Sequence, residues 1–371
     1  MTPARPDQED AKLGLLARLA AGPVICAEGF LFELERRGYL AAGEFVPEVA
    51  LDHPEALEAL HRDYQRAGSD IVEAFTYNGH REKMRVIGKE SLLEPLNRAA
   101  LRLARKVADD RPGNLMAGNI SNTNIWRPED RSAQAEVRSM FDEMVGWAVE
   151  DGAEMIIGET FYYAGEAFEA LDAIKASGLP AVVTIAPMAE NRMMDGAGIV
   201  ETCQELEARG ADVVGMNCFR GPATMLPWLE EIRKAVSCQV AALPVPYRTT
   251  EQEPTFFNLS DRGPCRCASP HGRPFPTALD PLYCNRYEIG AFAKEAYGLG
   301  IHYLGVCCGA SPMLSERSPK RSAGPPTRVG IRKRWRITSC TAPTNGSRNT
   351  SGRSATGHER CAGSRPSGSS A

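Results

Sequence analysis

Two apolar runs of the chain end in cysteine: VVGMNC at residues 213–218 and YLGVCCG at residues 303–309. Each run has the length and composition of a buried β-strand and is bounded by Gly or Asn. Their thiols, about 90 residues apart in the chain, can meet only in a fold whose strands all end on one face. A parallel β-barrel has this property, because every strand brings its C-terminal end to the same rim.

Further apolar runs of the same kind recur along the chain, with amphipathic helical patterns between them. We expect strands at 24–27, 70–75, 115–120, 155–158, 181–185, 213–216, 240–243 and 303–306, and helices that include 54–66, 92–108, 135–150, 167–176 and 287–297. Gly68 and Gly210 each precede a predicted strand as the C-cap of a helix. The alternation predicts an α/β protein with a (β/α)8 TIM barrel. A doubly wound sheet is the second choice, since no Gly-x-Gly-x-x-Gly follows the first strand.

The three strand-end cysteines, Cys218, Cys307 and Cys308, predict a metal site. Three thiolates would hold Zn²⁺ and leave its fourth position open, as in catalytic zinc sites. The alternative is that these cysteines are small buried apolar residues. For the other cysteines the structural role is the better interpretation, and no Cys-x-x-Cys pair is present.

Composition limits the class of protein. The chain has 371 residues, of which 43% are hydrophobic and 24% charged, enough for a large core. Its first eight residues are polar and no apolar run approaches the ~18 residues of a membrane span, so we expect no membrane association. Eleven cysteines without a secretion signal favour the reducing cytoplasm.

The C-terminal segment differs from the rest of the chain. Residues 311–371 carry ten Arg and two Lys against two Glu, whereas residues 1–310 carry 31 basic and 45 acidic side chains. The segment is rich in Ser, Pro, Gly and Thr, which predicts a disordered basic tail at 312–371 after a barrel domain at 1–311. It lacks the regular basic spacing and the interleaved aromatic residues that are typical of a nucleic-acid-binding segment, so we expect no nucleic-acid partner.

Polar and aromatic side chains at the predicted strand ends are candidates for a substrate site, because the C-terminal rim of a barrel carries its active site. An acidic residue there could bind an amine, and aromatic rings could face a cation. These candidates are Glu28, the segments 75–78 and 119–122, and 159–161.

Several stretches resemble one family. They include GFLFELERRGY at 29–39, FTY at 75–77, GMNC at 215–218 and GVCCG at 305–309. Through them the chain is similar, over roughly residues 12–312, to betaine–homocysteine S-methyltransferases of the zinc-dependent homocysteine methyltransferase superfamily, especially the shorter bacterial members. The resemblance implies Zn²⁺ on Cys218, Cys307 and Cys308, with the thiol of homocysteine as methyl acceptor and betaine as donor.

The resemblance also implies substrate-binding residues. It assigns the homocysteine amino group to Glu159 and its carboxylate to backbone N–H groups of Gly305 and Val306. Phe45, Phe75, Tyr77 and Phe161 are the aromatic residues available to the methyl donor. Asn217, which directly precedes Cys218, is a further substrate-binding candidate.

Three positions depart from the family pattern. The acidic residue of the first strand falls on Ala27, with Glu28 beside it. A tyrosine after the second strand becomes Asn78, and the tyrosine after Glu159 becomes Thr160. A related donor, the sulfonium S-methylmethionine, needs fewer aromatic residues and would tolerate Asn78. It is therefore the alternative methyl donor.

The family continues past the second cysteine motif with an amphipathic helix, whereas this pattern stops at Ser311 and Pro312. We hypothesise a shifted reading frame, because reading one base earlier from Met313 permits a helical sequence that ends in Gly. The nucleotide sequence tests this directly. A third alternative follows from it, a non-catalytic product with an impaired zinc site.

Overall fold

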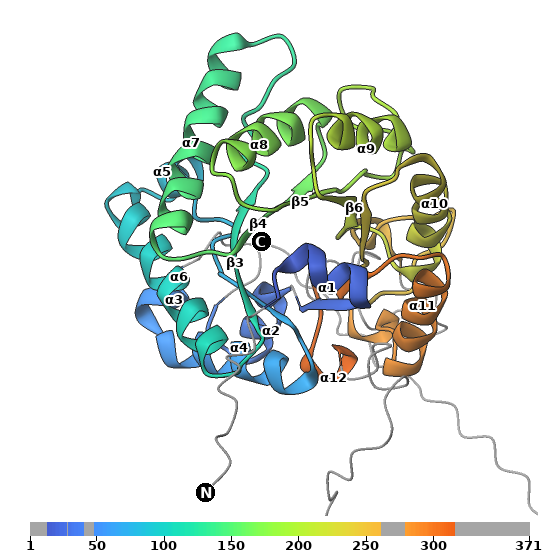
Figure 1. Cartoon of the computed structure of the whole chain (residues 1–371), viewed down its shortest axis with the longest axis horizontal. Coiled ribbons are helices and arrows are strands. Elements are labelled where there is room, and N and C mark those ends of the chain that lie inside the picture. The colour runs from blue at the N-terminus through green and yellow to red at the C-terminus, as the bar shows by residue number, and fades with distance from the viewer. Residues whose placement is uncertain (1–12, 28, 41–47, 261–278, 316–371) are drawn as a thin grey trace, which may run out of the picture. The chain divides into compact units, whose positions relative to one another are not determined.

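The strands of the protein close into a parallel barrel in which neighbours in sequence pair and β8 pairs with β1. The computed structural model describes residues 13–27, 29–40, 48–260 and 279–315. Figure 1 shows the strands surrounded by helices. The strands are β1 (Val24–Ala27), β2 (Ile71–Glu73), β3 (Leu115–Ser121), β4 (Met155–Phe161), β5 (Ala181–Ile185), β6 (Val213–Asn217), β7 (Gln239–Leu243) and β8 (Tyr303–Val306).

The predicted (β/α)8 barrel is confirmed, and all eight predicted strands form. The largest differences are at strand ends. β2 is shorter than expected because the chain turns after it, where the Thr76 N–H donates to the Ala74 carbonyl. β4 is longer because it continues through a register shift between Gly158 and Phe161.

Helices connect successive strands, and the five predicted helical segments are helical. In the described part of the chain none is both long and apolar enough to cross a bilayer. The helices are α1 (Leu15–Ala21), α2 (Phe30–Arg36), α3 (Val49–Asp52), α4 (Pro54–Ala67), α5 (Arg81–Val86), α6 (Leu93–Asp109), α7 (Arg131–Glu150), α8 (Ala164–Ala176), α9 (Ile199–Ala208), α10 (Pro222–Ala235), α11 (Arg286–Gly298) and α12 (Pro312–Ser315).

Local sequence accounts for several helix ends. Gly68 ends α4 in the left-handed conformation with φ 117°, as expected for a glycine C-cap. Asp130 caps the N-terminus of α7 by accepting from two backbone N–H groups. Asn285 and Glu288 form a capping box at the start of α11.

The strands bury both faces. Alternate side chains point into the barrel, where Ile71, Leu115 and Met155 belong to one apolar cluster. Their neighbours point outward against the helices, as Val72 and Met116 do. Each strand therefore delivers its last inward-facing residue to the C-terminal rim, and this parity decides which side chains reach the site.

Within the described residues after β8, Pro312–Ser315 form the short helix α12, inside the segment that the sequence predicts to be a disordered tail. Leu314 of this helix is buried and clusters with Val306, Cys284 and Ile289. The described chain ends at residue 315, so the remainder of the predicted tail lies outside the described residues.

Candidate metal and substrate site

Three thiols converge at the C-terminal rim of the barrel. The Sγ atoms of Cys218, Cys307 and Cys308 all lie within 4.8 Å of one another. β7 fixes their relative position, because it lies between β6 and β8. The Cys218 N–H donates to the Leu243 carbonyl at 2.9 Å, and the Cys307 N–H donates to the Pro244 carbonyl at 2.9 Å.

The backbone at Cys218 is strained. Cys218 and Phe219 have φ values of 55° and 50°, in the left-handed region that non-glycine residues seldom adopt. Such a conformation costs of order 1–3 kcal/mol and persists where surrounding structure imposes it. The Phe219 ring stacks on Phe256 and meets Phe257 edge-on. This packing holds the turn that directs the Cys218 thiol toward the cysteines after β8.

The thiols have unequal acidities. Burial alone would raise the pKa of Cys218, but hydrogen bonds from Cys307 and Cys308 outweigh it and lower that pKa to about 5. The pKa of Cys307 is raised well above its usual value by burial and by Cys218. Hydrogen bonding to Cys218 and Cys307 likewise raises the pKa of Cys308. One thiolate is thus stabilised by two neighbouring thiols.

This donor set fits Zn²⁺. Sulfur ligands of a tetrahedral zinc with Zn–S bonds of ~2.3 Å lie roughly 3.8 Å apart, and the three Sγ atoms all fall within 4.8 Å of one another. Soft sulfur donors favour zinc over Mg²⁺ or Ca²⁺. Three protein ligands also leave a fourth position for a substrate.

A layer of polar side chains lies beside the thiols, inside the barrel. The Asn119 side-chain amide donates to Glu73 and, at 2.7 Å, to Glu159. The Asn217 amide donates to the other oxygen of Glu159 at 2.7 Å and to the Cys307 sulfur at 3.6 Å. A chain of hydrogen bonds therefore runs from β2 through β3, β4 and β6 to the thiol cluster.

The orientation of Asn217 is fixed from its oxygen side. Its Oδ1 accepts from the Thr160 N–H and from the Thr184 hydroxyl, both at 2.9 Å. Thr160 has a φ of 63°, which is unusual for a β-branched residue. Since these contacts assign oxygen and nitrogen of the amide, the NH₂ group of Asn217 is the part that faces Glu159 and Cys307.

Glu73 is a second buried carboxylate in this layer, and its burial disfavours the ionised form. It is 2% exposed, and burial followed by the nearby charge of Glu159 raises the pKa of Glu73 well above its usual value. A second buried carboxylate close to the first is a feature of ligand sites rather than of cores, because cores exclude unpaired charge.

A cavity of about 450 Å³, including its open mouth, connects these groups. Among the predicted site residues it is lined by Phe75, Tyr77, Asn78, Glu159, Cys307 and Cys308. The Tyr77 hydroxyl accepts from Asn122 at 3.2 Å. With Phe30 and Glu73, the lining combines two of the thiols, two carboxylates and three aromatic rings on one surface.

Of the remaining predicted residues, Phe161 lies away from the cavity, and the roles predicted for the backbone N–H groups of Gly305 and Val306 stay predictions. Phe161 packs edge-on against Phe141 of α7 in the layer between barrel and helices, because the irregularity at Thr160 reverses the alternation of β4. Val306 faces the α12 cluster. Gly305 lies in β8, where an added Cβ would be 2.0 Å from the Cys26 carbonyl oxygen. Glu28 and Phe45 lie outside the described residues.

Sequence reasoning did not select Glu73 as a site residue, whereas Asn119 belongs to the predicted rim segment 119–122. A signal for Glu73 was present in the sequence, because it follows the inward-facing Ile71 by two positions within its strand. A carboxylate at an inward position near a strand end indicates a rim site rather than a surface.

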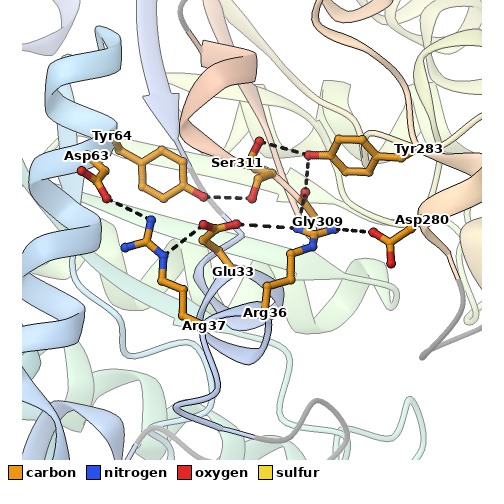
Figure 2. Close-up of polar contacts among 10 residues, drawn as sticks. Glu33, Arg36, Arg37, Asp63, Tyr64, Asp280, Tyr283, Gly309 and Ser311 are labelled. Carbon is orange, nitrogen blue, oxygen red and sulfur yellow. Dashed lines mark hydrogen bonds and ion pairs between the residues drawn. The ribbon is translucent and has the colours of Figure 1, made fainter.

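The backbone after the cysteines is held by a group of polar contacts (Figure 2). The Gly309 carbonyl accepts from the Arg36 guanidinium at 3.1 Å and from the Tyr283 hydroxyl at 2.8 Å. The Tyr64 hydroxyl donates to the Ala310 carbonyl at 3.1 Å. Arg36 also lies 5.2 Å over the Tyr283 ring. We call these three side chains, Arg36, Tyr64 and Tyr283, the clamp.

The chain is similar to known methyltransferases over most of its length. The family model described as homocysteine S-methyltransferase matches residues 25–314. Betaine–homocysteine S-methyltransferase 1 of Danio rerio is 35% identical over 306 residues, which cover 81% of this chain and 74% of that protein. The Xenopus tropicalis protein of the same name is 32% identical and covers 85% of this chain and 78% of its own length.

Two further similarities bear on the family. An S-methylmethionine–homocysteine S-methyltransferase of Pongo abelii is 33% identical over 85% of this chain and 84% of that protein. The metallated form of the Escherichia coli homocysteine methyltransferase MmuM has the same fold, with a TM-score of 0.62 at 16% identity over 81% of this chain and 98% of that one. With the matched family model, these relatives show that the chain belongs to the homocysteine S-methyltransferase family.

Proposed function

We propose that this protein is a zinc-dependent enzyme that transfers a methyl group from betaine, or a related methylated ammonium, to homocysteine and so forms methionine. The observation that carries the proposal is the convergence of three thiols beside a cavity lined by Glu159, Phe75 and Tyr77. This combination supplies a metal site, an anion for the amino group, and aromatic surface for a cation.

The residues of the chain have separate roles in this proposal. Cys218, Cys307 and Cys308 would hold the zinc ion, and Asn217 orients Cys307 and Glu159 relative to each other. When bound there, zinc supplies the Lewis acidity that keeps a substrate thiol deprotonated at neutral pH. Glu159 would bind the homocysteine ammonium.

The methyl donor needs positioning more than acid–base chemistry. A bond forms between the homocysteine sulfur and the methyl carbon while the bond from that carbon to nitrogen breaks. The electron pair stays on nitrogen, so a neutral tertiary amine leaves without needing a proton. The work of Phe75 and Tyr77 is to hold the cation in line and to exclude water, since orientation lowers the barrier of a two-substrate reaction.

S-methylmethionine is the second candidate donor. The position at which the family pattern has a tyrosine is Asn78, which lines the cavity. An amide offers less cation–π attraction than an aromatic ring. The Pongo abelii relative, named for S-methylmethionine, is as similar in sequence as those named for betaine.

A direct assay tests both parts of the proposal. The purified protein is incubated with homocysteine and either betaine or S-methylmethionine, and methionine is measured by mass spectrometry alongside the zinc content. We expect about one zinc ion per chain and faster turnover with betaine. Faster turnover with S-methylmethionine would select the second donor.

Substitution of the thiols tests the metal site. Cys218→Ala should lose both zinc and activity, because two protein ligands are fewer than the three of a catalytic site. The matched control is Cys203→Ala, which removes a buried thiol of α9 in the outer apolar layer. Full activity of Cys218→Ala after dialysis against a chelator would contradict the zinc site.

A further inference from the structure

We propose that Glu73 is a specificity-determining residue that binds the ammonium group of the thiol substrate together with Glu159. This inference rests on the proposed function, because it assumes an amino thiol as the methyl acceptor. It predicts that the site distinguishes homocysteine from a thiol of the same length without an amino group.

Position in the barrel is the first argument. Glu73 and Glu159 occupy inward-facing positions of β2 and β4, and both line the cavity that Cys307 and Cys308 reach. The NH₂ group of Asn119, on the strand between them, donates to one oxygen of each carboxylate. The two carboxylates are therefore close enough to share a single nitrogen with several N–H donors, as an ammonium group has.

Charge balance is the second argument. The described residues that line the cavity include no Lys, Arg or His side chain beside the two carboxylates. Buried carboxylates are costly unless they are paired with a cation or hydrogen-bonded. A substrate ammonium beside Glu73 would provide that counter-charge to it within a few bonds of the reacting sulfur.

The third argument is an unused acceptor on the same side chain that joins the carboxylates. Asn119 is 4% exposed, and its Oδ1 has no hydrogen-bond partner among the described residues. A buried amide oxygen without a donor is uncommon in native structures. An ammonium group has three N–H donors, and Asn119 lines the same cavity as the two carboxylates.

The test measures binding without any methyl donor. Homocysteine and its des-amino analogue, 4-mercaptobutanoate, are titrated into the zinc-loaded protein by calorimetry. We expect wild type to bind homocysteine more tightly than the analogue. Glu73→Gln should weaken homocysteine binding about 10- to 100-fold, as expected for one lost charge-assisted hydrogen bond, and leave analogue binding unchanged. A merely structural role would weaken both ligands alike and overturn the inference.

Two further variants complete the experiment. Glu159→Gln should keep a preference for homocysteine of about tenfold, because Glu73 remains; equal binding of both thiols by this variant would overturn the inference even if Glu73→Gln failed to fold. Glu166→Gln is the matched control, since Glu166 is a fully buried carboxylate held by Thr123 and is absent from the cavity lining. Its preference should equal that of wild type, and an equal loss in this control would overturn the assignment.

The binding measurement also separates this inference from the proposed function. Wild-type protein that prefers homocysteine through Glu73 but makes no methionine with either donor would support the Glu73 assignment and overturn the proposed methyl transfer. Methionine formation with no preference between the two thiols would do the reverse.

Discussion

Removing the Arg36 side chain should weaken zinc binding at the proposed site, although Arg36 is not one of the proposed ligands. Arg36→Ala deletes a charged hydrogen bond of 3.1 Å to the Gly309 carbonyl, directly after Cys308, and such a bond contributes ~1.5–3 kcal/mol. It also deletes the contact over the Tyr283 ring at 5.2 Å, worth ~0.5–1 kcal/mol. The ion pairs of Arg36 with Glu33 and Asp280, both 3.8 Å, add ~0–1 kcal/mol because they are partly solvated.

These contributions sum to roughly 2–5 kcal/mol of unfolding free energy, which lowers the Tm of a barrel of this size by roughly 3–8 °C. The larger consequence concerns the site, because the clamp holds the backbone that carries Cys308. We expect Arg36→Ala to release zinc to a competing chelator faster than wild type does. Arg36→Lys should recover part of the stability, since it keeps the charge but not the planar guanidinium.

Circular dichroism melting and zinc release to a chromogenic chelator measure these two effects. The matched control is Arg209→Ala, which removes an arginine that lies 4.5 Å over the Phe168 ring and pairs with Glu205 at 2.8 Å on the helical surface. That variant should lose about 1 kcal/mol and release zinc at the wild-type rate. If the two alanine variants melt and release zinc alike, the clamp has no special role in positioning the cysteines.

Three other changes have definite expectations. Gly309→Ala should lose zinc and melt lower than Gly178→Ala, because both glycines have positive φ but only at 309 would the new Cβ lie 2.5 Å from the Tyr247 hydroxyl; equal melting would contradict the clash. Leu314→Ala should cost ~2–4 kcal/mol in urea unfolding, since this side chain is 1% exposed; a loss below 1 kcal/mol would mean that α12 does not stabilise the barrel. Burial lowers the pKa of His61 to about 3. In the unfolded chain this side chain binds a proton below about pH 6.5, whereas in the folded protein it stays neutral until the pH is near 3. Stability should therefore fall as the pH drops from ~6.5, and His61→Phe should lose ~2 kcal/mol less than wild type between pH 7 and pH 5, measured by urea unfolding at both values.

The barrel and the convergence of the three cysteines could be predicted from patterns in the sequence. Strand and helix patterns are local, because alternation with period two and amphipathic periodicity arise from the backbone of each segment alone. Eight apolar runs separated by helices leave few arrangements other than a closed parallel barrel, and that fold carries every strand end to one rim. The sequence therefore predicts that three cysteines lie close together at this rim, and the structure confirms it for Cys218, Cys307 and Cys308.

The side chains that surround those cysteines could not be predicted from the sequence, because they come from distant parts of the chain. The left-handed turn at Thr160 reverses β4 and turns Phe161 away from the cavity, and no local pattern in the sequence marks that irregularity. The link from Arg36 to Gly309 joins residues 273 positions apart, and the bridge of Asn119 between Glu73 and Glu159 joins three strands. Contacts of this kind depend on strand register and on the packing of loops over the rim. These contacts depend on the whole fold, because the distance between two such side chains is fixed by the positions of all the strands that lie between them.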